Sequence, residues 1–137
     1  MANSKSKGDR RERQAEELIS DVDFITERPN KTGYQQTVVD FFDGLFDILA
    51  VKPGEKVLCV QVKSNRARGI NNFVEEVQEK VPLEHCIVQF WVCYDTEGWR
   101  VIEINDEGYE TVYDERDDTR NMGDALREEY LTPKFNQ

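Results

Sequence analysis

The sequence predicts a single α/β domain in which a mixed central β-sheet is flanked by helices. Its 137 residues are enough for one hydrophobic core and too few for two ordinary ones. Segments with helical apolar spacing alternate along the chain with short apolar runs that are typical of strands covered on both faces. A composition that is 38% hydrophobic and 10% aromatic argues against a disordered chain.

The N-terminal region is predicted to begin with a disordered basic tail, residues 1–8, and to continue as a helix from Asp9 to about Ser20. Apolar residues recur in this helix at three- and four-residue spacing: Ala15, Leu18, Ile19 and Val22. Residues 22–28 are predicted as a short strand, because turn-forming proline, asparagine and glycine follow it. The sequence of residues 35–43 does not distinguish a helix from a strand or a loop.

A strand hairpin and a second helix are predicted next. Residues 44–51 and 56–64 are strongly apolar, and the intervening Lys52-Pro53-Gly54-Glu55 segment has the composition of a turn. A basic loop then leads into a helix over residues 70–81 with apolar residues at helical spacing. The two strands are therefore expected to be neighbours in the sheet.

The C-terminal half is predicted as three strands and a last helix. The strands cover residues 86–94, 99–104 and 109–113, with hairpin turns between them. The acidic residues 114–120 are expected to be exposed, and a helix over 122–130 is expected to pack through Ala125, Leu126 and Tyr130. Residues 114–137 are accordingly assigned to an acidic C-terminal segment with a short helix.

The overall charge argues against a nucleic-acid binder, but its distribution does not. The net charge is −10 and the isoelectric point is about 4.6, whereas proteins that bind nucleic acids are usually basic. However, the first 13 residues carry five basic and two acidic side chains, while residues 103–129 carry eleven acidic and three basic ones. A basic region could therefore form away from the acidic segment.

The sequence indicates an intracellular, cytoplasmic protein without a membrane anchor. No apolar run approaches the roughly 20 residues of a membrane-spanning helix, and the polar N-terminus does not resemble a secretion signal. The three cysteines, Cys59, Cys86 and Cys93, show no zinc-ligand spacing with the single His85. Reduced, buried cysteines suit an intracellular location.

Three polar residues in the predicted hairpin form a candidate site. Gln61 and Lys63 are two residues apart in a strand, so their side chains project from the same face, while Val60 and Val62 project from the other. Asp47 lies in an equally apolar part of the partner strand, where a lone carboxylate would be costly. The residues could form a structural Asp–Lys pair, lie at strand ends that reach solvent, or form a catalytic centre.

The pattern resembles the PD-(D/E)xK nuclease superfamily, and within it the archaeal Holliday-junction resolvases and their viral relatives. Residues 10–94 carry four similar motifs: Arg11-Glu12-Arg13, Phe24 to Pro29, Phe46-Asp47-Ile48 and Gln61-Val62-Lys63-Ser64. The resemblance implies a restriction-endonuclease-like α-β-β-β-α-β core, followed here by a C-terminal hairpin and helix. It implies a nuclease-like domain over residues 9–113.

The same resemblance implies a DNA endonuclease that uses Mg²⁺ or Mn²⁺. Asp47 would be the central metal ligand, Lys63 the catalytic lysine, and Glu12 an outer acid from the first helix, with Glu16 in reserve one turn later. Gln61 departs from the family, which has a second acid there; its carbonyl can ligate a hard cation but adds no charge. The implied catalytic set is thus Asp47, Gln61, Lys63 and Glu12, and all but Lys63 would hold metal.

Basic residues near this set are candidate DNA contacts, because Arg and Lys neutralise phosphates. They are Arg11, Arg13, Arg28, Lys31, Arg66 and Arg68. Members of the family that cut junctions act as homodimers, and the apolar hairpin of residues 86–104 could supply the interface. Two alternatives remain open: a nuclease-like binding or assembly module without catalysis, and an acidic protein whose residues 114–129 dock a basic partner.

Overall fold

One six-stranded sheet organises the computed structural model, which describes residues 4–28 and 44–136. The strands lie side by side in chain order, and every neighbouring pair is antiparallel except the central pair β3–β4. Their bounds are β1 (Ile25–Glu27), β2 (Ile48–Val51), β3 (Val57–Ser64), β4 (Cys86–Tyr94), β5 (Gly98–Asn105) and β6 (Gly108–Asp114). The predicted single α/β domain with a mixed sheet is confirmed.

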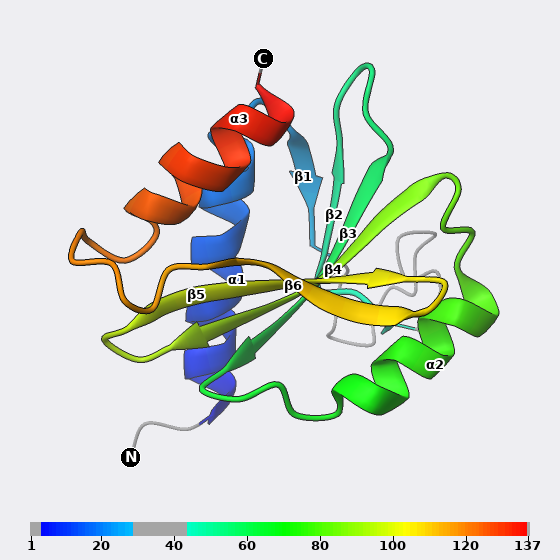
Figure 1. Cartoon of the computed structure of the whole chain (residues 1–137), viewed down its shortest axis with the longest axis horizontal. Helices are drawn as coiled ribbons and strands as arrows, with labels where there is room; N and C mark the ends of the chain where they lie inside the picture. The colour runs from blue at the N-terminus through cyan, green and yellow to red at the C-terminus, as the bar shows by residue number, and fades with distance from the viewer. Residues whose placement is uncertain (1–3, 29–43, 137) are drawn as a thin grey trace.

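Helices cover both faces of this sheet (Figure 1). On one face, α1 (Ser4–Ser20) packs together with the C-terminal helical segment, which consists of the wide-turned η2 (Leu126–Leu131) and α3 (Thr132–Phe135). On the other face lies α2 (Ile70–Lys80), which connects the parallel strands β3 and β4. The order of helices and strands along the chain, including the C-terminal hairpin and helix, is the predicted one.

The alternation along β3 decides which side chains meet which helix. Val60 and Val62 are buried in the same cluster as Ala15 and Ile19 of α1. Cys59 is buried in the cluster of α2. Because strand side chains alternate between faces, Gln61 and Lys63 belong to the face opposite α1.

The N-terminal elements begin and end at different residues from those predicted. Helix α1 begins at Ser4, so residues 4–8 of the predicted tail are helical. Its C-terminal end closes in a turn with Asp23 at a left-handed φ of 72°, and β1 therefore has three residues, Ile25–Glu27, in place of the predicted 22–28. The ambiguous residues 35–43 lie outside the described ranges.

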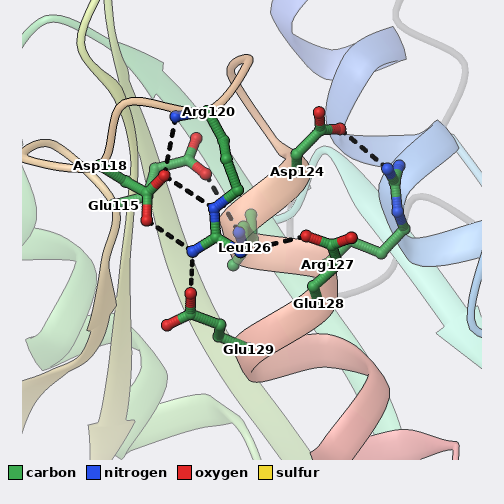
Figure 2. Close-up of polar contacts among 8 residues, drawn as sticks. All are labelled: Glu115, Asp118, Arg120, Asp124, Leu126, Arg127, Glu128 and Glu129. Carbon is green, nitrogen blue, oxygen red and sulfur yellow. Dashed lines mark hydrogen bonds and ion pairs between the residues drawn. The ribbon is translucent and has the colours of Figure 1, made fainter.

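The C-terminal segment is part of the core, and the predicted exposure of residues 114–120 is wrong at Glu115. This side chain is 3% exposed, and its carboxylate accepts backbone N–H groups of Trp99 at 2.9 Å, Gly123 at 2.8 Å and Leu126 at 3.1 Å. Figure 2 shows it beside the start of the C-terminal helix. The carboxylate thus supplies acceptors to donors that a helix N-terminus leaves unsatisfied.

The acidic surface of this segment is also partly neutralised from within. Arg120 bonds to Asp118 at 2.5 Å, to Glu128 at 3.1 Å and to Glu129 (Figure 2). Leu126, Leu131 and Phe135 are buried against α1 and the sheet. Because one acid is buried and three share an arginine, this surface gives no support to a docking site for a basic partner.

The predicted dimer interface on residues 86–104 is wrong, because β4 and β5 are interior strands. Their side chains fill the core on both faces, with Phe90, Trp91, Trp99 and Ile102 at most 1% exposed. Gln89 is also fully buried; it donates to Glu103 and Tyr130 and accepts from Trp91.

In the described part of the chain, no helix is both long and apolar enough to span a membrane.

Candidate functional site

Asp47 lies against the backbone of β3, just before β2 begins. Its own N–H donates to the Val60 carbonyl at 2.8 Å, and its Oδ2 accepts the Val62 N–H at 2.8 Å. The residue is 8% exposed. The carboxylate therefore takes the place of a backbone acceptor at the end of the β2–β3 ladder. It lies next to Gln61, as the predicted hairpin requires.

Gln61 and Lys63 are both half-buried on β3. Gln61 Nε2 donates to the Leu45 carbonyl at 3.1 Å, which anchors the amide to the chain that leads into Asp47. Within the described residues, its Oε1 accepts no hydrogen bond. The Asp47 carboxylate, just before β2, and the Gln61 carbonyl, on β3, are thus neighbouring oxygen ligands of the kind that a hard cation requires.

Lys63 lines a basic cleft of about 390 Å³ at the C-terminal end of β3. The five cationic residues that line this cleft are Lys7, Arg11, Lys63, Arg66 and Arg68. Val62 and Ser64 also line it, so the strand whose backbone binds Asp47 forms one wall. No carboxylate of the described residues lies within ion-pair distance of Lys63, Arg66 or Arg68, so within residues 4–28 and 44–136 these three side chains form no ion pair.

Glu12 and Glu16 share one face of α1, as their spacing predicts, but both face Arg28. Glu12 Oε1 is 3.9 Å from Arg28 Nη1, and Glu16 Oε1 is 3.4 Å from Arg28 Nε. Thr26 also donates to Glu16 at 2.8 Å. Arg28 is thus paired with two carboxylates of α1, and its predicted contact with DNA stays a prediction.

Across residues 4–28 and 44–136, no group of three or more Asp, Glu, His or Cys side chains gathers where it could hold a metal ion. The structure therefore brings together Asp47, Gln61 and the β3 backbone, with Lys63 one residue beyond Val62. The predicted role of Glu12 as a second acidic ligand stays a prediction.

Arg11 lines the cleft from inside the protein and is only 7% exposed. Its Nη2 is 2.5 Å from Asp95 Oδ1, and its Nη1 donates to Gln14 at 2.8 Å. Of the other predicted DNA contacts, Arg13, Arg66 and Arg68 are exposed, and Lys31 lies outside the described residues. Arg11 thus differs from them, because it is a buried ion-paired cation.

Sequence reasoning missed two residues of this region, Lys7 and Asp95. Lys7 bonds to Asp95, as Arg11 does, because the helix starts early enough to place the two cations one turn apart. These hydrogen bonds, together with one from Asn65, hold the pKa of the Asp95 carboxyl well below its usual range. The i,i+4 spacing of Lys7 and Arg11 was the available signal, but nothing local pointed to Asp95.

Two of the three cysteines, Cys59 and Cys93, are buried as predicted, whereas Cys86 is partly exposed. Burial raises the pKa of Cys59, and it raises the pKa of Cys93 to about 11. Since the thiolate is the nucleophile and the metal ligand, neither thiol is reactive at neutral pH. The chemistry of the region therefore belongs to the Asp47, Gln61 and Lys63 group and to the adjoining cleft.

Comparison with known proteins shows a likeness to solved structures and to no family model. No model of a protein family matches this sequence, and neither does any curated protein. Among solved structures, the chain is similar to Hjc of Archaeoglobus fulgidus, a Holliday junction resolvase from an archaeal hyperthermophile. The TM-score is 0.51 at 18% sequence identity, over 77% of this chain and 87% of that one. The two proteins share a fold.

Proposed function

We propose that this chain is a DNA endonuclease that hydrolyses phosphodiester bonds with Mg²⁺ or Mn²⁺ and acts on branched DNA in the manner of a Holliday-junction resolvase. The observation that carries the proposal is the connection between Asp47 and the basic cleft. The carboxylate is one hydrogen bond from Val62, and Val62 and Lys63 form the cleft wall. A fold shared with a resolvase supports it.

Asp47 and Gln61 are the residues that would hold the metal. Mg²⁺ is bound in proteins through one or two carboxylates, and it keeps several waters and takes phosphate oxygens from the substrate. One carboxylate and one amide carbonyl suit this arrangement, but they carry a single negative charge between them. We therefore expect weak metal binding by the free protein and tighter binding once DNA supplies phosphate oxygens.

The cation would activate a water and polarise the scissile phosphate. The protein's own contribution comes from its fixed charges. Lys63 would stabilise the negative charge that develops on the phosphate oxygens, and Arg66 and Arg68 would hold neighbouring phosphates. Because no carboxylate of the described residues neutralises these three side chains, their full charge is available to a polyanion.

Cleavage of end-labelled DNA by the full chain tests the proposal. A four-way junction, a linear duplex and a single strand are each incubated with Mg²⁺, Mn²⁺ or EDTA. We expect junction cleavage with either metal, none with EDTA, and none by Asp47→Ala or Lys63→Ala. Lys56→Ala is the matched control, because Lys56 is an exposed lysine near the opposite end of β3. Equal inertness of the wild type and both site variants on all substrates would refute the enzymatic proposal.

A DNA-binding module without catalysis is the second candidate. It is favoured by Gln61 at the position of the family's second acid, and by the missing three-acid cluster among the described residues. Such a module would bind the junction in EDTA and would take up no Mn²⁺ through Asp47. A Mn²⁺ titration of the wild type and of Asp47→Asn, with and without DNA, separates the two candidates.

Homodimerisation stays part of the proposal, with a surface other than the predicted hairpin. Ile25 and Val51 are paired across β1 and β2 and are 73% and 47% exposed. This end of the sheet therefore presents apolar side chains that β4 and β5 do not. Sedimentation equilibrium of the wild type tests for the dimer, and a monomer at all concentrations would contradict it.

A further inference from the structure

Asp95 joins three separate segments at the mouth of the basic cleft. It lies in the turn between β4 and β5, and its carboxylate binds Lys7 and Arg11 of α1. The same carboxylate accepts Asn65 Nδ2 at 3.1 Å, from the loop that carries Arg66 and Arg68. Two walls of the cleft are therefore tied to one anion that is not itself part of the cleft lining.

Asp95 is attached to Asn65 by two hydrogen bonds. Its backbone N–H donates to Asn65 Oδ1 at 2.8 Å while its side chain accepts from the same amide, so the two residues are bonded at two points. Asn65 itself has a left-handed φ of 65°, and its N–H donates to the Cys93 carbonyl at 2.8 Å. Asp95 is thus anchored at the end of the β3–β4 ladder, where its carboxylate also binds the two cations of α1.

The cations need such support, because like charges that converge on one cleft repel one another. Lys7 has a long side chain that loses considerable rotamer freedom when it is held in one place. Arg11 is buried, and a buried guanidinium requires a partner. Asp95 supplies both with the same fixed acceptor, and it thereby sets where their remaining donors point.

We propose that Asp95 is a positioning residue for phosphate binding, which holds Lys7 and Arg11 as a second wall opposite Lys63, Arg66 and Arg68. The inference rests on the proposed function, because it assigns the DNA backbone as the ligand of this cleft. It adds that a phosphate beside the scissile one binds to the α1 wall. DNA affinity therefore depends on a negatively charged residue.

The test measures whether DNA affinity falls when the negative charge of Asp95 is removed. Removal of an acid near bound DNA ordinarily tightens binding, because it removes repulsion. We expect Asp95→Asn to weaken binding of a fluorescein-labelled four-way junction, measured in EDTA by anisotropy, by about fivefold, because charge-assisted bonds to Lys7 and Arg11 are lost. The slope of log affinity against log salt concentration should fall by about one, the change that one lost phosphate contact produces.

Two further variants keep the result specific. Glu97→Gln removes the same charge from the same turn without touching the cleft, and it should bind the junction as tightly as the wild type or slightly tighter. Lys7→Ala should weaken binding, and Asp95→Asn should add little to it, because both changes disable the same contact. Circular dichroism of each variant verifies that the fold is kept.

The outcomes distinguish this inference from the proposed function. If the wild type does not bind the junction, both are overturned. If the wild type binds and a folded Asp95→Asn binds equally well or more tightly, the positioning role alone is overturned. Additive effects of Lys7→Ala and Asp95→Asn would also overturn it, because independent residues contribute additively.

Discussion

The Val62 N–H donates a 2.8 Å hydrogen bond to Asp47 Oδ2, and this bond couples the candidate site to the fold. Asp47 is buried, and its carboxylate accepts a structural backbone donor at the position where metal binding is proposed. Substitutions of Asp47 must therefore be chosen to separate the loss of an acceptor from the loss of a charge.

Asp47→Ala should destabilise the protein by about 1–3 kcal/mol, because the Val62 N–H is left buried without an acceptor. Asp47→Asn keeps an oxygen acceptor and should cost less. Urea unfolding followed by circular dichroism measures both. Equal stability of the alanine variant and the wild type would show that the bond contributes nothing. A folded Asp47→Asn without cleavage activity would assign the loss to the missing charge.

Gln61→Glu should strengthen Mn²⁺ binding by about tenfold or more, because a second carboxylate doubles the ligand charge. Without metal, the new carboxylate faces the Leu45 carbonyl that now accepts from the amide, and the variant should be slightly less stable. The measurement is the rise in unfolding temperature on adding Mn²⁺, which ligand binding to the folded state produces. A rise no larger than that of the wild type would remove Gln61 from the metal site.

Glu115→Ala should destabilise the protein by about 3 kcal/mol or more, because several buried backbone donors lose their acceptor together. The effect should be a cooperative loss of the C-terminal helical packing, seen in chemical denaturation. Glu110→Ala, an exposed glutamate on β6, is the control and should change stability by less than about 0.5 kcal/mol. Similar values for the two variants would contradict the role of Glu115.

The contribution of Asp95 to stability should depend on pH in one direction. Its pKa is lowered in the folded protein by hydrogen bonds from Lys7, Asn65 and Arg11, so the ionised form favours folding. The contribution is fully present above the unfolded-state pKa of about 3.9 and is lost as the pH falls toward the lower folded-state value. Unfolding temperatures of the wild type and Asp95→Asn should therefore differ above about pH 5 and converge in acid. A difference that persists unchanged in acid would argue against this coupling.

Local patterns were sufficient for most of the fold. The apolar run of β4 and the spacing of Phe73, Val74 and Val77 in α2 are buried as their periodicity predicts. The Pro-Gly turn after Val51 predicted the pairing of β2 with β3, which the structure confirms. Because neighbouring residues determine these features, the Asp47, Gln61 and Lys63 group could be proposed from the sequence.

Charged residues were harder to assign, because their environment depends on distant parts of the chain. Glu115 resembled its acidic neighbours, yet it is buried against the backbone of Trp99 and of the C-terminal helix. Arg28 resembled a DNA contact, yet it faces Glu12 and Glu16. No local signal distinguishes a solvated charge from one that meets a partner in another element.

By itself, the sequence determined the order of the elements, the α/β class and the hairpin that places Asp47 beside Gln61, because hydrophobic periodicity and turn chemistry act over a few residues. Only the tertiary structure decided which charges meet a distant partner. It brings Asp95 to Lys7 and Arg11 from more than eighty residues away, and it gathers five cations in one cleft of an acidic protein. Contacts between residues so far apart in the sequence form only when α1 packs on the sheet, which no local pattern predicts. Asp95 pairs with two of the five cations of the cleft, Lys7 and Arg11.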